Sequence, residues 1–124
     1  MHIVAVRGLS LESSQNNCGG RALRPEYISE VKKICKKNKI KMHLDGARSW
    51  NSSIYLGIDM KEMVSDFDIV NVCLSKGMGC PAGSIIAGSE ADIKRAKVFR
   101  KMLGGGMRQT GVFSAAALVS LMDW

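Results

Sequence analysis

Two charged residues, Asp45 and Lys76, stand where this sequence pattern would place a reactive site. Asp45 follows the alternating apolar positions of segment 40–44, and Lys76 follows the β-branched run 69–74. In open α/β sheets, ligands bind beyond the carboxyl ends of the parallel strands. A lysine and a carboxylate that converge there suit pyridoxal phosphate, because the amine can hold the cofactor and the acid can keep its ring nitrogen protonated.

The spacing of these two residues is also compatible with simpler roles. Asp45 stands where it would cap a helix beginning at Ala47, since aspartate oxygens accept hydrogen bonds from the first backbone amides of a helix. Lys76 lies in a glycine-rich segment and fits a solvated loop lysine. From spacing alone, both interpretations stay open.

The segments that must position Asp45 and Lys76 alternate between strand and helix patterns. Short apolar segments at 3–6 and 9–11 precede a polar loop at 12–21, and Pro25 opens an amphipathic helix. Strands are then predicted at 40–44, 69–74 and 84–87, with a helix at 47–56. A helix between two strands predicts a right-handed parallel connection, whereas the short link 75–83 predicts an antiparallel third strand. The predicted class is α/β, with a mostly parallel sheet flanked by helices.

The last third of the sequence predicts two more helices. Ser89, with Asp92 three residues later, opens one that runs to about Met102 and stops at the glycine run 104–106. The second begins at about Arg108 and is apolar on nearly every side, so it should be buried. Because few segments are left to cover it, we expect this chain to form oligomers or to be a piece of a longer protein.

Several motifs follow one another along the chain, within a stretch from Leu9 to Leu121. They are Leu11-Glu12, Asn16, Cys18-Gly19-Gly20-Arg21, His43-Leu44-Asp45-Gly46-Ala47-Arg48, Asn51, Cys73-Leu74-Ser75-Lys76-Gly77-Met78-Gly79, Pro81, Gly83-Ser84 and Arg100-Lys101-Met102-Leu103-Gly104-Gly105-Gly106-Met107-Arg108-Gln109. In this order they resemble the low-specificity threonine aldolases, which are fold-type-I pyridoxal phosphate enzymes of the threonine aldolase and β-eliminating lyase group.

The resemblance implies a role for each matched site residue. Lys76 would be the catalytic Schiff-base lysine, Asp45 the carboxylate on the pyridine nitrogen, and Arg48 the arginine on the cofactor and substrate side. Lys101 and Arg108 match positions near the cofactor, across a subunit interface. Lys101 also fits a solvated charge, and the glycine run 104–106 also fits a plain helix stop.

The implied activity is retro-aldol cleavage of L-threonine or L-allo-threonine to glycine and acetaldehyde, in a cytoplasmic homo-oligomer. The resemblance makes residues 1–124 the central part of an aspartate-aminotransferase-like large domain, without the family's phosphate loop, ring-stacking histidine or carboxylate-binding arginine. We therefore expect this chain alone to be inactive, so a non-catalytic truncated remnant stays an alternative. Gln15 stands where the family usually has histidine and Ser13-Ser14 replaces its usual Asn-Thr, which leaves the role of the Glu12 loop open. Cys80 stands where a small residue such as alanine is common, a change with no evident chemical meaning.

Composition bounds the remaining classes of function. With 18 Lys and Arg against 11 Asp and Glu, the chain carries a net charge of +7, but its basic stretch 32–41 lacks interleaved aromatic residues, so a nucleic-acid-binding module is the weaker alternative. The four cysteines form no Cys-x-x-Cys pair, which argues against a structural zinc site and fits reduced thiols. Apolar runs are too short to cross a membrane.

Overall fold

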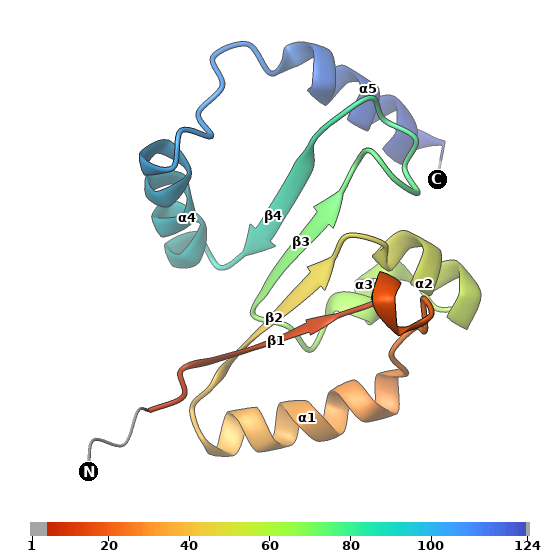
Figure 1. The fold of residues 1–124 in the computed structure, drawn as a ribbon, viewed down its shortest axis with the longest axis vertical. Coiled ribbons are helices and arrows are strands. Elements are labelled where there is room, and N and C mark those ends of the chain that lie inside the picture. Colours follow the sequence, from red (N-terminus) through yellow and green to blue (C-terminus); the bar gives the residue numbers. More distant parts are fainter. Residues whose placement is uncertain (1–4, 124) are drawn as a thin grey trace.

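The computed structural model describes residues 5–123 and holds one four-stranded sheet (Figure 1). The strands are β1 (Gly8–Glu12), β2 (Lys41–Gly46), β3 (Ile69–Cys73) and β4 (Ser84–Gly88), in spatial order β1-β2-β3-β4. The first three are parallel and β4 is antiparallel to β3. The connection lengths predicted the parallel pair β2–β3 and the antiparallel β4, whereas the pairing of β1 with β2 was not predicted. The apolar segment expected at 3–6 lies partly outside the described residues, and residues 5–7 form no strand.

Five α-helices connect and flank these strands. They are α1 (Pro25–Lys37), α2 (Ser49–Leu56), α3 (Met60–Val64), α4 (Glu90–Met102) and α5 (Gly111–Met122), with a short 3-10 turn η1 (Asn16–Cys18) after β1. The short helix α3 was not predicted, although its Asp59 side chain accepts a hydrogen bond from the Lys61 amide, as an N-cap does. The predicted starts of α2 at Ala47 and α5 at about Arg108 are wrong by two and about three residues.

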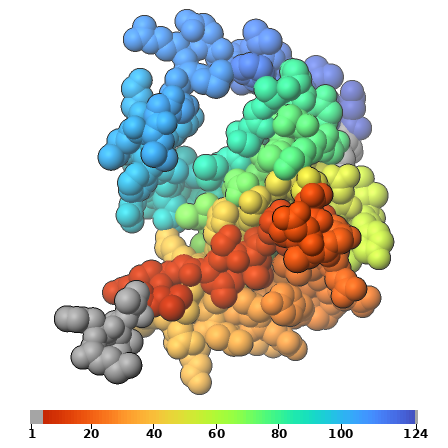
Figure 2. Space-filling view, viewed as in Figure 1, coloured from red at the N-terminus to blue at the C-terminus, as the bar shows by residue number. Residues whose placement is uncertain are grey.

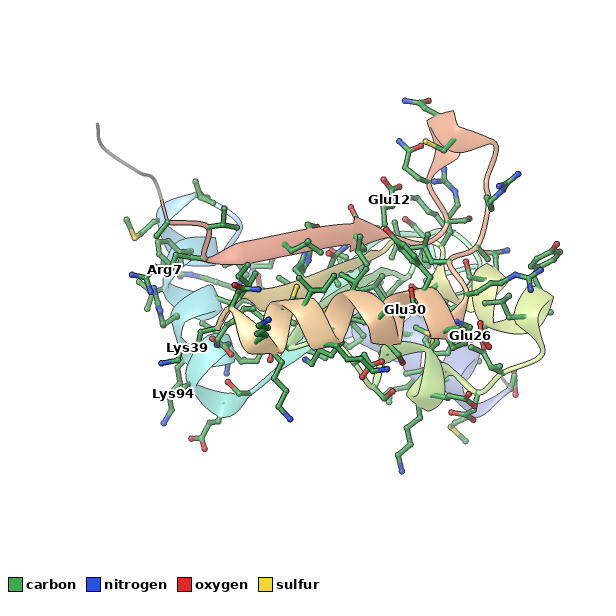
Figure 3. The ribbon with its side chains drawn as sticks, turned by 90° about the horizontal axis from the view of Figure 1, so that it is seen from below. Arg7, Glu12, Glu26, Glu30, Lys39 and Lys94 are labelled. Atoms are coloured by element: carbon green, nitrogen blue, oxygen red, sulfur yellow. The ribbon has the colours of Figure 1, made fainter. Side chains whose placement is uncertain are left out.

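The apolar face of the sheet packs on α1. Met42 and Leu44 of β2 are fully buried, and Met42 clusters with Ile28 and Cys35 of α1. Figure 3 shows α1 running along the sheet, with Glu12 toward the carboxyl end of β1 and with Arg7 and Lys39 toward the opposite end. The carboxyl ends of the parallel strands therefore share one edge, as a site formed by Asp45 and Lys76 requires.

Helix α5 is not buried, contrary to the prediction from its apolar sequence. Only Ala117 is buried, while Leu118 and Val119 are about 60% exposed and Met122 is 85% exposed. Figure 2 shows that α4 and the segment leading to α5 arch away from the strands and leave an opening. Since a uniformly apolar helix has no preferred inner face, its sequence does not say which side a neighbour must cover.

Helix α4 is tied to the sheet by an ion pair. Lys41 Nζ of β2 lies 2.6 and 2.7 Å from the two carboxylate oxygens of Asp92, and the Ser89 hydroxyl donates to Asp92 Oδ2 at 2.6 Å. The hydrogen bond from Lys41 and then that from Ser89 hold the pKa of Asp92 below the ordinary aspartate value. A depressed pKa stabilises the fold above the ordinary aspartate range, and this stabilisation is lost as pH falls through the lowered pKa.

We predict that replacing Lys41 with methionine raises the titration midpoint of the Asp92 carboxyl group, measured by carbon NMR, and flattens the acid limb of the stability curve. The matched control is Lys94→Met, because Lys94 pairs with Glu90 at 2.8 Å on the same helix. If both variants left the Asp92 midpoint equally unchanged, the ion pair would not be the cause of the depressed pKa.

Within residues 5–123, no helix is long and apolar enough to cross a membrane. The same part of the chain holds no group of three or more His, Cys, Asp or Glu side chains that could bind a metal ion. All four cysteines are free. The apolar neighbours of Cys35 and Cys73 predict burial, and Cys35 is buried whereas Cys73 is only partly buried; Cys80 is buried as well and Cys18 is exposed.

Candidate active site

Asp45 lies in β2, one residue before its end, and holds two hydrogen bonds on one oxygen. Its Oδ1 accepts from the Ala47 backbone amide at 3.1 Å and from Asn71 Nδ2 of β3 at 3.1 Å. The structure gives Oδ2 no partner among residues 5–123. Asp45 thus does stabilise the turn into α2, but that role uses one oxygen and leaves the other available.

Asn71 continues into a row of polar side chains on the face of the sheet opposite α1. His43 Nε2 lies 2.7 Å from Asn71 Oδ1, and Ser10 Oγ of β1 lies 2.8 Å from His43 Nδ1. The register explains the row, because Ser10 pairs with His43 and Asp45 pairs with Asn71 across adjacent strands. Sequence patterns alone single out neither Ser10 nor Asn71, since their proximity to His43 depends on the strand register.

Lys76 lies in the turn after β3, and its side chain is exposed. The Gly79 amide donates to the Lys76 carbonyl oxygen at 2.9 Å, and the loop closes where the Leu74 amide donates to the Gly83 carbonyl oxygen at 3.0 Å. Gly79 has φ +67, a left-handed conformation that favours glycine. The loop backbone is therefore fixed while the amine of Lys76 stays accessible.

Buried side chains anchor the Lys76 loop from below. Leu74, Met78 and Cys80 form a cluster with Ala117 of α5 and partly buried Trp50 of α2. The Ser120 hydroxyl also donates to the Met78 carbonyl oxygen at 2.6 Å. The place of Cys80 in this cluster gives it a packing role, which accounts for the departure noted from the sequence.

Gly77 is the point where the Lys76 loop touches α2. A Cβ atom added at Gly77 would lie 2.6 Å from Asn51 Oδ1 and 3.5 Å from Trp50 Cβ. Because real Cβ atoms do not approach that closely, only glycine lets the loop lean on α2 without a shift. The loop that carries Lys76 therefore passes close to the helix that follows Asp45.

We predict that Gly77→Ala forces the exposed Asn51 side chain to turn away and lowers stability by about 1 kcal/mol, the low end of the cost of overpacking, since Asn51 Oδ1 is the end of a flexible side chain. Adding Asn51→Ala should recover much of this loss, because it removes the nearest atoms. Gly111→Ala is the matched control, since nothing lies within 4 Å of an added Cβ there. Urea unfolding of the four proteins tests this; a double variant no more stable than Gly77→Ala would contradict the contact.

Arg48 is half-buried and occupies the N-cap position of α2, three residues after Asp45. The Arg48 side chain therefore extends from the N-terminus of α2, where backbone amides that have no partner within the helix already favour an anion. The loop after β1 closes over the same region. Ser13 is fully buried, its amide donates to the Asp45 carbonyl oxygen at 3.2 Å, and its hydroxyl accepts from the Leu23 amide at 3.1 Å.

The loop after β1 and α2 also line a hollow of about 410 Å³. Its walls come from Ser14, Gly19, Gly20, Arg21, Ala22, Asn51, Ser52 and Tyr55. The hollow reaches Asn51, the residue against Gly77, but neither Asp45 nor Lys76 lines it. Residues 19–21 of the family-matched segment 18–21 therefore line this hollow and are not part of the Asp45–Asn71 row.

Lys101 and Arg108 are exposed, and the structure does not join them to Asp45 or Lys76 by any hydrogen bond or ion pair within residues 5–123. Helix α4 ends in a backbone cap, with Gly104 at φ +79 and its amide donating to the Lys101 carbonyl oxygen at 3.2 Å. The Gly105 amide donates to the Arg100 carbonyl oxygen at 2.8 Å, which completes a Schellman motif. The glycine run is thus a helix stop, and Arg108 precedes α5 instead of beginning it.

Comparison with known proteins gives this arrangement a family. The model of the β-eliminating lyase family matches residues 1–124. A probable low-specificity L-threonine aldolase of Arabidopsis thaliana is 50% identical over 123 residues, which are 99% of this chain and 35% of that protein. The crystal structure of a putative aromatic amino acid β-eliminating lyase/threonine aldolase from Exiguobacterium superposes with a TM-score of 0.89 at 26% identity, covering 98% of this chain and 34% of that one.

A third match is the crystal structure of a putative L-allo-threonine aldolase from Listeria monocytogenes, with a TM-score of 0.85 at 28% identity. It covers 92% of this chain and 32% of that one. The chain thus spans about a third of the length of the relatives that it matches. The matched motifs, the mixed sheet and the family model agree, and the chain belongs to the β-eliminating lyase family.

Proposed function

We propose that the protein cleaves L-threonine or L-allo-threonine to glycine and acetaldehyde with pyridoxal phosphate. The observation that carries this proposal is the placement of an accessible lysine, Lys76, and a carboxylate with one free oxygen, Asp45, at the carboxyl ends of the neighbouring parallel strands β3 and β2. The names of the relatives, low-specificity threonine aldolase and L-allo-threonine aldolase, support the substrate class.

The residues present fit the cofactor. Asp45 has an oxygen that makes no hydrogen bond within residues 5–123, which is what a protonated ring nitrogen needs as a partner. Lys76 is exposed on a loop held by backbone hydrogen bonds, so its amine can reach an aldehyde without disturbing the fold. When bound, pyridoxal phosphate would supply an electron sink for the pair of electrons left when the Cα–Cβ bond breaks.

Each site residue has a defined task in this proposal. Lys76 Nζ would hold the cofactor, and Asp45 Oδ2 would hold the proton on its ring nitrogen. Arg48, at the start of α2, would place positive charge near the cofactor and the substrate. Lys101 and Arg108 would act from a second subunit of a homo-oligomer, since their own chain does not bring them to Asp45 or Lys76. The four free cysteines support a reducing compartment such as the cytoplasm.

The products formed from L-threonine test the proposed function. Turnover, here and in the variants below, is measured on this chain extended by the flanking segments that its relatives carry, because the 124-residue chain alone is expected to be inactive. We expect that extended protein, with pyridoxal phosphate, to release glycine and acetaldehyde in equal amounts from L-threonine or L-allo-threonine. The competing chemistry for this family is β-elimination, which converts threonine into 2-oxobutanoate and ammonia without breaking Cα–Cβ. Formation of ammonia in place of glycine would overturn the aldolase assignment but keep the cofactor.

A further inference from the structure

The hydrogen-bonded row across β1, β2 and β3 has a direction that the chemistry of its members fixes. A carboxylate can only accept, so the Asn71 side-chain atom facing Asp45 must be the Nδ2 amine. Asn71 Oδ1 then faces His43 and must accept, so His43 Nε2 carries a hydrogen. In a neutral ring, His43 Nδ1 is consequently an acceptor and receives the hydroxyl hydrogen of Ser10.

The hydrogen bonds of this row reach only one of the two carboxylate oxygens of Asp45, Oδ1. Asn71 Nδ2 and the Ala47 amide both donate to Oδ1, which fixes the rotation of the carboxylate about its last bond. Asn71 is itself prevented from turning, because a flipped amide would set its oxygen against Asp45 and its amine against the Nε2 hydrogen of His43. Asn71 and His43 are both half-buried, so these hydrogen bonds compete little with water.

We propose that Asn71 is a positioning residue that acts on the cofactor through Asp45. His43 and Ser10 hold Asn71 in place, and Asn71 fixes the Asp45 carboxylate so that Oδ2 is the oxygen available to the ring nitrogen. This inference rests on the proposed function of Asp45. The matched family motifs give no role to Ser10 or Asn71. Here, the row of hydrogen bonds lets side chains of β1 and β3 fix the orientation of the Asp45 carboxylate on β2. Asn71 touches neither substrate nor cofactor in this account.

The test replaces Asn71 with leucine, which has a similar size but no donor. We expect the dissociation constant for pyridoxal phosphate to rise and kcat to fall by about tenfold, with KM changed less than about twofold, as when a supporting hydrogen bond to a site ligand is removed. Ile69→Val is the matched control, because Ile69 lies on the same strand and face, two residues earlier, and makes no polar contact. The inference is overturned if Asn71→Leu behaves like Ile69→Val.

A double-mutant cycle tests that His43 acts through Asn71. His43→Phe should weaken cofactor binding less than Asn71→Leu, and the double variant should be no worse than Asn71→Leu alone, because the row is already cut there. Additive effects would overturn the row as a unit. These effects are measured on binding of the cofactor, so they do not depend on turnover.

A nitrogen NMR spectrum of the unsubstituted protein needs no variant to fold. At pH 8, where imidazoles are mostly neutral, His43 should carry its hydrogen on Nε2, and the opposite tautomer would overturn the inference. The Asp45→Asn variant separates this inference from the proposed function. If Asp45→Asn lowers turnover and Asn71→Leu does not weaken cofactor binding, only the inference fails; if Asp45→Asn has no effect, both fail.

Discussion

Replacing Asp45 with asparagine is expected to leave the cofactor attached through Lys76 but to lower kcat by about a hundredfold or more, the scale seen when one pre-oriented charge partner is removed. An amide has one oxygen, and the Ala47 and Asn71 donors at 3.1 Å both demand it. The amine of the asparagine would then face the protonated ring nitrogen, donor against donor. The ring would lose its proton and with it most of its capacity to accept electrons.

The control for this variant is Asp59→Asn. Asp59 also accepts a backbone hydrogen bond in a turn, from the Lys61 amide at 2.6 Å, and asparagine caps helices about as well as aspartate. Asp59→Asn should therefore leave kcat and stability close to those of the unsubstituted protein. Near-normal kcat in Asp45→Asn as well would show that Asp45 serves only the turn into α2.

Replacing Lys76 with alanine is expected to lower kcat by at least about a thousandfold, because the attachment point of the cofactor is lost. The free energy of unfolding should change by less than about 0.5 kcal/mol, since the Lys76 side chain is exposed and the loop is held by backbone hydrogen bonds and by Leu74, Met78 and Cys80 beneath it.

Two measurements on the Lys76→Ala variant separate chemistry from structure. Urea unfolding reports stability, and steady-state glycine release reports kcat. Lys33→Ala, a change of an exposed lysine on α1, is the control and should alter neither. A Lys76→Ala variant that keeps a tenth or more of the original kcat would remove Lys76 from the catalytic role.

The parts of the fold that could be predicted from sequence are those that local patterns determine. The alternation of Met42 and Leu44 with Lys41 and His43 gave a strand, and the lengths of the links gave its parallel and antiparallel neighbours. The prediction that α5 is buried was wrong. An apolar sequence indicates that a helix is more stable when other residues cover it, but it does not show that the described residues do so. The single-turn helix α3 has too few residues for a periodic signal.

The residues of the candidate site also fall into those that the sequence identifies and those that depend on the folded sheet. Asp45 and Lys76 could be singled out because each follows a predicted strand, and Arg48 because it lies in a motif that resembles the family's; both are properties of the sequence. Ser10 and Asn71 could not, because the row that they form with His43 depends on strand register, which a one-residue slip would abolish. The roles of Lys101 and Arg108 stay predictions, since no hydrogen bond or ion pair within residues 5–123 joins either of them to Asp45.

The central claim is that Lys76 is the residue to which the cofactor attaches. Borohydride reduction of the protein loaded with pyridoxal phosphate fixes the cofactor covalently to the amine that holds it, and mass spectrometry of the peptides then locates the added mass. We expect one modified peptide, with the adduct on Lys76, and no such adduct in the Lys76→Ala variant. An adduct on another lysine, with Lys76 unmodified, would contradict it.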